Sequence, residues 1–234
     1  MRVGWSLVFV LFSVPLVCEG QSTRTRPSVD PSTSQSSASQ QLGQTDRGAA
    51  QDATLRAAMG LQKTERLMVA DFNQPSWQTN LGDPFGGWDH DPSDRTQFCR
   101  PRLVDEPRLG NTGYTLMLEY DVDSPNPAFN GFWMKLHSIP LHDFRVLSFA
   151  MRGDPDRGYT KRVKLELKDA RHRASYVLDG IQPTWVRMRI PLKAFQNIEH
   201  IKAATEFVIV FDDHTVTEKS GTLYLDDVAF ETAP

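Results

Sequence analysis

The sequence predicts an all-β domain, an antiparallel β-sandwich, behind an N-terminal leader. From Leu67 to Pro234, short apolar runs recur about every ten to fifteen residues, separated by Gly, Pro, Asn and Asp. Several runs alternate apolar and polar residues, which is the period of a strand with one buried face. Within this stretch, only Leu192 to Ala204 has the character of a short helix. About nine or ten strands joined by turns favour a sandwich.

The first 20 residues have the three parts of a secretory signal peptide. Arg2 supplies a charge, Val3 to Val17 an apolar run, and Cys18 and Gly20 small residues before a cleavage site at Gln21. The run is shorter than the ~20 apolar residues that a spanning helix needs, so no stable membrane insertion is expected. This predicts a secreted or periplasmic protein. The alternative is a lipoprotein, in which Cys18 would carry the lipid.

Residues 21–66 are expected to form a tether. Gln21 to Gln51 is dominated by Ser, Thr, Gln and Pro, so burial cannot offset the entropy cost of ordering it, and disorder is predicted. Asp52 to Arg66 has better helix formers and allows one short amphipathic helix, with Asp52 as its N-cap. The domain proper is then Leu67 to Pro234.

The strands of the domain are expected in a regular succession. Gly82 to Pro107 reads as a long irregular stretch, while Phe207 to Phe211 is nearly all apolar and is expected to be central. In Arg162 to Lys168, Val, Leu and Leu point inward and the charged residues outward. The expected strands are Leu67–Phe72, Tyr114–Asp121, Gly131–Leu136, Phe144–Met151, Arg162–Lys168, Ala174–Leu178, Trp185–Ile190, Phe207–Phe211 and Thr222–Phe230, the first lying near the last.

Composition excludes some classes of function. Among 234 residues, 26 basic and 29 acidic side chains give a net charge of -3, and no basic arm or stripe indicates nucleic-acid binding. The two cysteines are Cys18 and Cys99. If Cys18 leaves with the signal peptide, no intrachain disulfide is possible, and stability depends on the core.

No catalytic motif stands out. The chain has no G-x-S-x-G, H-E-x-x-H, P-loop or dinucleotide fingerprint, and its His residues lack metal-ligand spacing. Cys99 in QFCRP has no recognisable His partner motif and is expected to be a packed thiol. No catalytic residue is therefore predicted, and the protein is expected not to be an enzyme.

The stretch Gly131 to Leu136 offers the best candidate for a binding surface. Strict alternation places Phe132, Met134 and Leu136 on one face and Trp133 and Lys135 on the other. An indole beside an ammonium on the non-core face is typical of a ligand-stacking surface, and equally of an ordinary half-buried sheet edge.

Several phrases together resemble a known family. Their order and spacing are similar to those of galactose-binding-like jelly-roll modules of bacterial extracellular proteins, especially family-11-type carbohydrate-binding modules. The resemblance covers nearly all of Leu67 to Phe230. A more distant likeness is to the sandwich domain of complex I assembly factors, a role against which a signal peptide argues. The phrases are LMVADFN from Leu67, NGFWMKL from Asn130, VLSFAMRGD from Val146, RVKLELKDA from Arg162, GIQPTWVRMRIPLKAF from Gly180 and GTLYLDDVAF from Gly221.

The resemblance implies a glucan-binding sheet face lined by aromatic side chains. Phe132 and Phe211 fall at positions where the family has cleft tyrosines, and Leu178 stands where the family has a third. The alternative for Phe132 and Phe211 is that they pack in the core. The charged residues of Arg162 to Lys168, beside Trp133, would suit acidic or amphoteric saccharides, or would simply be a solvated sheet face. The resemblance and the strand alternation together give the predicted ligand-binding residues, which are Phe132, Trp133, Lys135, Lys164, Glu166 and Phe211.

The resemblance also implies a structural calcium ion that joins the first and last strands. Asp71 and Asp226 stand at the matching positions and are the candidate ligands. Calcium takes six to eight oxygens, so backbone carbonyls can complete the set. The alternative is a pair of capping carboxylates in a turn.

Two functions follow from the sequence. One is a secreted, non-catalytic module that binds a polysaccharide or oligosaccharide. The other is a structural or protein-interaction domain of the cell envelope on the same scaffold. The sequence identifies no protein partner and no particular saccharide.

Overall fold

The computed structural model describes residues 65–232. The predicted signal peptide, the tether and its short helix lie outside the described residues. Among residues 65–232, no helix is long and apolar enough to cross a membrane.

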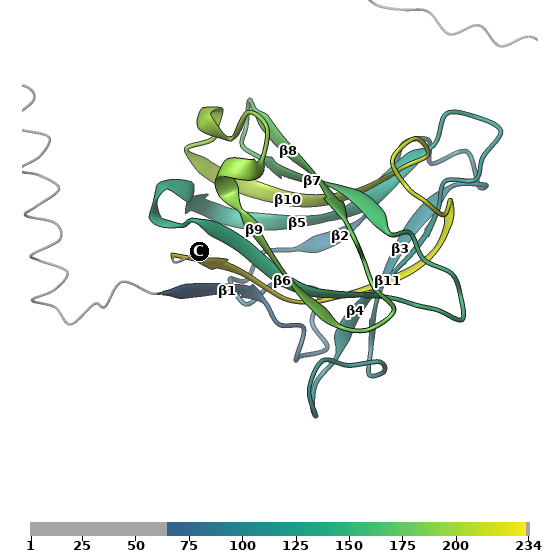
Figure 1. Cartoon of the computed structure of the whole chain (residues 1–234), viewed down its shortest axis with the longest axis horizontal. Coiled ribbons are helices and arrows are strands. Elements are labelled where there is room, and N and C mark those ends of the chain that lie inside the picture. Colours follow the sequence, from purple (N-terminus) through teal and green to yellow (C-terminus); the bar gives the residue numbers. More distant parts are fainter. Residues whose placement is uncertain (1–64, 233–234) are drawn as a thin grey trace, which may run out of the picture. The chain divides into compact units, whose positions relative to one another are not determined.

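The described residues form two antiparallel sheets, which confirms the predicted β-sandwich (Figure 1). The five-stranded sheet has the order β2-β5-β10-β7-β8, and the six-stranded sheet has the order β3-β4-β11-β6-β9, with β1 also paired to β11. The strands are β1 Arg66–Ala70, β2 Phe85–Asp89, β3 Phe98–Val104, β4 Thr115–Asp121, β5 Phe129–Pro140, β6 Val146–Gly153, β7 Arg162–Lys168, β8 Arg173–Asp179, β9 Val186–Pro191, β10 Ala203–Asp212 and β11 Ser220–Glu231.

The first and last strands pair directly, as the sequence predicted. Arg66 lies opposite Glu231, and Leu67 lies opposite Phe230. The prediction that β10 is central is also correct, because β10 pairs with β5 on one side and β7 on the other.

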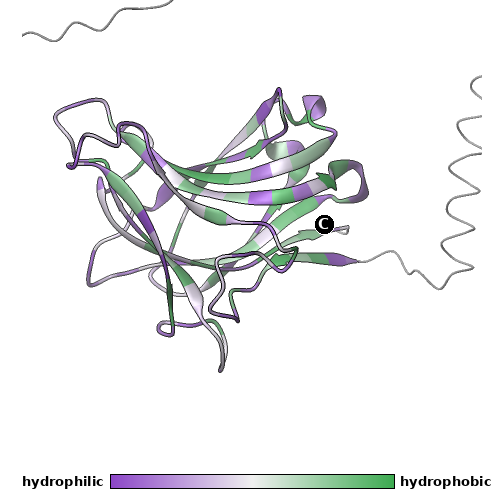
Figure 2. Ribbon diagram, turned by 180° about the vertical axis from the view of Figure 1, so that it is seen from behind, coloured by the Kyte–Doolittle hydropathy of each residue, from purple (hydrophilic) through white to green (hydrophobic). Residues whose placement is uncertain are grey.

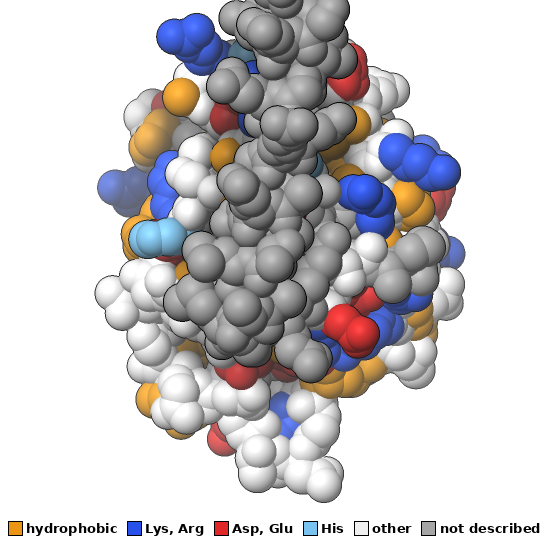
Figure 3. Space-filling model, turned by 90° about the vertical axis from the view of Figure 1, so that its left-hand side faces the viewer, with side chains coloured by type: hydrophobic (Ala, Val, Ile, Leu, Met, Phe, Trp, Pro, Cys, Tyr) orange, Lys and Arg blue, Asp and Glu red, His pale blue; other side chains and the backbone are white. Residues whose placement is uncertain are grey.

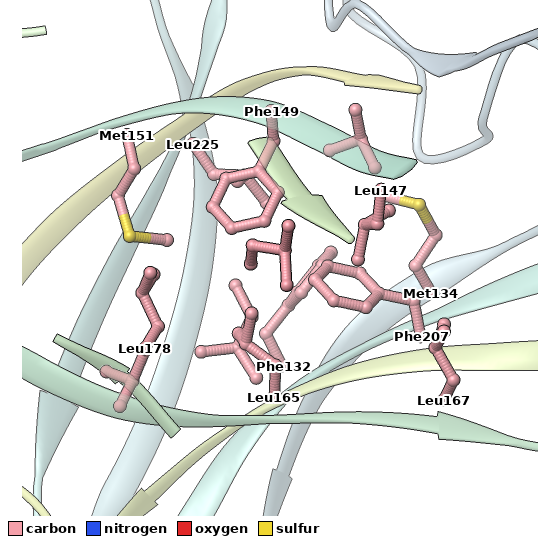
Figure 4. Packing of buried hydrophobic residues seen from close by; sticks show 14 of the residues in the cluster. Phe132, Met134, Leu147, Phe149, Met151, Leu165, Leu167, Leu178, Phe207 and Leu225 are labelled. Carbon is pink, nitrogen blue, oxygen red and sulfur yellow. The ribbon is translucent and has the colours of Figure 1, made fainter. Parts of the chain in front are cut away.

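The core lies between the two sheets. Figure 4 shows side chains of β5, β7 and β10 pointing toward those of β6 and β11. Phe132, Phe149 and Phe207 are fully buried. Tyr120 and Phe211 stack in parallel, with ring centroids 4.1 Å apart and an interplanar angle of 1°. The alternation of inward apolar residues in each strand therefore builds one continuous core.

The helix predicted for Leu192 to Ala204 is wrong. Two 3₁₀ turns, η2 (Leu192–Ala194) and η3 (Ile198–His200), occupy this segment, and β10 already begins at Ala203. Asn197 between the turns has a φ of 64°, in the left-handed region, so a continuous α-helix cannot pass through it.

The irregular stretch predicted for Gly82 to Pro107 is also wrong, because it contains β2 and β3. Glycines in β2 and Pro101 in β3 hid the strand pattern. A Cβ on Gly87 would lie 2.4 Å from the carbonyl oxygen of Cys99, so this close approach requires glycine. Pro101 is tolerated because β3 is an edge strand, paired only on its β4 side in the described sheet.

Candidate functional site

The outer face of the five-stranded sheet carries the candidate site. Strands β5 and β10 bow so that this face lies on the concave side of the sheet (Figure 1). Hydrophilic segments of neighbouring strands lie side by side here (Figure 2). Strand pairing arranges the outward side chains in rows. One row runs Gly86, Trp133, Val208, Glu166, Ser175, and the next runs Lys135, Glu206, Lys168, Arg173.

Two tryptophans lie across glycines of the neighbouring strand. A Cβ on Gly86 of β2 would lie 3.1 Å from the Trp133 ring of β5. Reciprocally, a Cβ on Gly131 of β5 would lie 3.0 Å from Nε1 of Trp88 on β2. The Trp133 Nε1 donates a hydrogen bond of 3.3 Å to the carbonyl of Gly87. Because both tryptophans are only half-buried, the pair forms an aromatic platform that remains accessible to solvent.

The platform continues toward one end of the sheet. The Trp88 ring lies 5.7 Å from that of Phe129, in an edge-on arrangement. The imidazole of His90 stacks on Phe129 with centroids 4.0 Å apart. Four rings from β2, β5 and the residue after β2 thus follow one another along the outer face.

A network of charged side chains adjoins the platform. The Lys135 ammonium pairs with Glu206 and lies 5.6 Å from the centroid of the Trp133 ring. Lys168 Nζ lies 3.3 Å from Glu206 Oε1 and 3.4 Å from Glu166 Oε2. Neighbouring cations therefore compensate both carboxylates, Glu206 and Glu166, which lie in adjacent rows.

Glu166 is the centre of this network. Its side chain is only 4% exposed, and Lys164 and Arg173 each approach Oε1 to 3.5 Å, in addition to Lys168. A carboxylate at this depth requires such partners, because burying an unpaired charge is costly. The network contains four cations (Lys135, Lys164, Lys168 and Arg173) and two carboxylates, so this part of the face is positively charged.

The structure brings together four of the six predicted ligand-binding residues. Trp133, Lys135, Lys164 and Glu166 share the outer face. The assignment of Phe132 and Phe211 to this face is wrong, because both rings are fully buried between the sheets. Alternation along the strand already placed Phe132 on the face opposite Trp133, and only the family resemblance assigned it to the binding face.

Sequence reasoning missed Trp88, Glu206 and Arg173. Trp88 lay in the stretch judged irregular, although FGGWD alternates Phe85 and Gly87 against Gly86 and Trp88. Glu206 and Arg173 each come just before an expected strand (Phe207–Phe211 and Ala174–Leu178). Only the pairing of β10 with β5 and of β7 with β8 places them beside Lys135 and Lys168.

The two candidate metal ligands lie near each other. Asp71 follows β1 and accepts a hydrogen bond of 3.1 Å from the backbone N–H of Asn73. Asp226 lies in β11, beside an irregularity in the β6 pairing, and is 3% exposed. Burial raises the pKa of Asp226 to about 7. The charges of Asp227 and Asp71 also raise it, while a hydrogen bond from the backbone N–H of Asp227 lowers it. Within residues 65–232, no group of three or more His, Cys, Asp or Glu side chains could hold a metal ion.

Cys99 is a buried thiol inside β3. Burial raises its pKa far above the usual range, and the charge of Asp89 adds to this. Because the thiolate is the reactive form, Cys99 is unsuited to nucleophilic chemistry.

No protein-family model matches the chain, and no curated protein matches it. Several solved structures, however, are similar to this chain. A family 11 carbohydrate-binding module of a cellulosomal cellulase of Clostridium thermocellum aligns with a TM-score of 0.53 at 13% identity, covering 72% of this chain and 95% of the module. A structure of a family 11 module from the same organism with a beta-1,3-1,4-mixed-linked tetrasaccharide aligns with a TM-score of 0.53 at 14% identity, covering 72% and 96%.

An exo-beta-agarase is also similar, with a TM-score of 0.51 at 9% identity, and the match covers 71% of this chain and 25% of the agarase. At these identities the likeness is one of fold. It supports the predicted jelly-roll fold, a sandwich of two antiparallel sheets.

Proposed function

We propose that this protein is a non-catalytic carbohydrate-binding module that holds an oligosaccharide on the outer face of its five-stranded sheet. The observation that carries this proposal is the Trp133–Trp88 platform beside the charged network of Glu166 and Glu206. An aromatic ring offers an apolar face to the C–H side of a sugar, while charged side chains hydrogen-bond its hydroxyl groups. The shared fold with a module solved with a tetrasaccharide supports the same reading.

The charge of the face favours an acidic or amphoteric saccharide. Four cations against two carboxylates leave a local excess of positive charge beside the Trp133 ring. Electrostatic complementarity contributes more to specificity than to raw affinity, so the charge is expected to select among saccharides that all stack on the platform.

The carboxylates of the face are not arranged for hydrolysis. A glycosidase needs one carboxyl that donates a proton and a second that acts as a nucleophile or base. Here Glu166 is engaged by three cations and Glu206 by two. Both carboxylates are therefore held by fixed cations, and Glu206, whose side chain is 18% exposed, is more accessible to a ligand than Glu166, at 4%. Secretion of the module rests on the signal-like sequence of residues 1–20.

A structural calcium ion is part of the proposal. Asp71 and Asp226 would hold it, since the buried Asp226 carboxyl is disfavoured in its charged form by its own burial and by two neighbouring carboxylates. A divalent cation would compensate these charges and tie β1 to β11, with backbone carbonyls completing the oxygen set.

The test is a titration of the full chain with neutral mixed-linked glucan oligosaccharides and with uronic-acid oligosaccharides, followed by tryptophan fluorescence. Trp133→Ala is expected to abolish a saturable change. Trp77→Ala is the matched control, since Trp77 is 51% exposed and its ring contacts that of the inward-facing Phe85. If no saccharide binds the folded protein, the interaction-domain alternative replaces this proposal.

A further inference from the structure

A second concave feature lies at one end of the sandwich, away from the tryptophan platform. It is a pocket of about 1130 Å³ between the β5–β6 corner and the β9–β10 connection. The corner contains the 3₁₀ turn η1 (Leu141–Asp143), and the connection contains η2 and η3. Both connections lie at the end of the domain that carries the C-terminus (Figure 1). Thr232, after β11, also lines the pocket.

The floor of the pocket is apolar. Leu141, Phe144, Leu192 and Ile201 line it and are 4–8% exposed, so they present small patches of otherwise buried side chains. Ile198 of η3 adds a half-buried side chain to the wall. Ligand pockets in proteins are typically about 300–1,000 Å³ and are lined mainly by apolar side chains with a few polar groups. The pocket has this character.

Backbone hydrogen bonds hold the walls in place. The N–H of Leu141 donates to the carbonyl of Lys202 (3.0 Å), which ties η1 to the start of β10. The N–H of Leu192 donates to the carbonyl of Arg145 (2.8 Å), which ties η2 to the start of β6. Because both walls are fixed by main-chain bonds, the pocket is formed before any ligand enters.

The rim of the pocket is basic. Arg145, Lys193 and Lys202 line it together with His142, and Glu199 is the one acidic side chain among the lining residues. Nη1 of Arg145 donates to the carbonyls of His142 and Phe144, each at 3.0 Å, which orients the guanidinium. A guanidinium has five N–H donors, so Arg145 retains donors for an anion. On the visible part of this end, hydrophobic side chains lie among Lys and Arg side chains (Figure 3).

We propose that this pocket binds a single-chain amphiphile with an anionic head group, of which a long-chain fatty acid is the simplest example. The acyl chain would lie on Leu141, Phe144 and Leu192, since apolar surface is stabilised by leaving water. The head group would meet Arg145 and Lys202 at the rim, where the excess of positive charge disfavours a cationic head. The site is separate from the saccharide face and does not depend on it.

The experiment compares three amphiphiles that share a dodecyl-length chain and differ in the head group. Laurate, dodecyl maltoside and dodecyltrimethylammonium are each titrated into the full chain below their aggregation concentrations, with binding measured by calorimetry. Saturable binding of laurate, about tenfold or more tighter than that of dodecyltrimethylammonium, supports the proposal. Equal binding of all three heads overturns the anionic selectivity. Absence of binding by any of them overturns the site.

Variants locate the site. Lys202→Glu is expected to weaken laurate binding about tenfold, since it removes one attraction and adds a repulsion. Ile198→Glu places a carboxylate in the apolar wall and should abolish binding, with thermal melting to verify that the variant folds. Lys161→Glu is the matched control, because Lys161 precedes β7 at the opposite end of the five-stranded sheet. If Lys161→Glu weakens binding as much as Lys202→Glu, the assigned location is wrong.

Two further measurements are needed. One distinguishes binding of a free fatty acid from binding to a membrane surface, and the other distinguishes the pocket from the saccharide face. Vesicles of anionic phospholipid that bind while monomeric laurate does not would indicate a membrane surface and overturn the pocket proposal. Trp133→Ala should leave laurate binding unchanged, so failure of saccharide binding and failure of this proposal are distinguishable.

Discussion

The neighbouring residues Phe132 and Trp133 provide the sharpest test of how the two faces of β5 are used. Phe132 is fully buried, and its ring lies 5.9 Å from that of Phe85 within the core. Trp133 is half-buried and covers Gly86 on the outer face. Replacing each with alanine removes an aromatic ring from the same strand, one from the core and one from the proposed saccharide site.

The expected magnitudes differ because the environments differ. Deleting a fully buried Phe ring costs about 3–5 kcal/mol, since transfer and cavity terms add. For a domain of about 150–250 residues, each 1 kcal/mol shifts the Tm by about 2–4 °C, so Phe132→Ala should lower the Tm by roughly 6 to 20 °C. Trp133→Ala removes only partly buried apolar surface and should cost less than about 2 kcal/mol.

The assay is thermal melting of both variants, followed by the saccharide titration at a temperature where both remain folded. Phe132→Ala is expected to melt early yet to retain binding, while Trp133→Ala is expected to melt near the parent protein and to lose binding. A Tm for Phe132→Ala within about 3 °C of the parent, or a larger loss for Trp133→Ala, would refute the assignment of the two faces.

Three further predictions follow from buried polar groups. Burial raises the pKa of Asp154, but hydrogen bonds from the Tyr224 hydroxyl (2.7 Å) and from backbone N–H groups outweigh this and lower it overall. The contribution of ionised Asp154 to stability is therefore present above the unfolded pKa of 3.8 and is lost as the pH falls below it. The Tm measured from pH 6 to 2 should drop in this range, and it should drop less in Tyr224→Phe; an acid profile of Tyr224→Phe identical to that of the parent would contradict the role of this hydrogen bond. Cys99 should resist alkylation in the folded protein and react on denaturation, as judged by mass spectrometry, because burial suppresses its thiolate; rapid labelling of the native chain would contradict this burial. Calcium should raise the Tm of chelator-treated protein, an increase absent in Asp226→Asn; an equal increase in the variant would exclude Asp226 as a ligand.

The strand pattern and the face of most side chains could be predicted from the sequence. Val163, Leu165 and Leu167 alternate with charged residues, and the structure places these three in the core. The outward position of Trp133 followed from the same two-residue period, which is a local property of the extended chain. The prediction failed where glycine masked the period, as in β2, and where Asn197 interrupted an apparent helix.

The composition of each site was decided by the tertiary structure. Trp88 and Trp133 are 45 positions apart in sequence, and only the antiparallel register of β2 on β5 lays each across a glycine of the other strand. The register of strands distant in sequence is set by core packing, so it cannot be read from either strand alone, and an error of one residue exchanges the two faces. This explains why the sequence could not place Trp88 beside Trp133, whereas the assignment of Phe132 to the binding face came from the family resemblance alone. Which residues alternate along a strand could be read from the local sequence. Packing of the two sheets decided which of them meet, because those contacts are non-local.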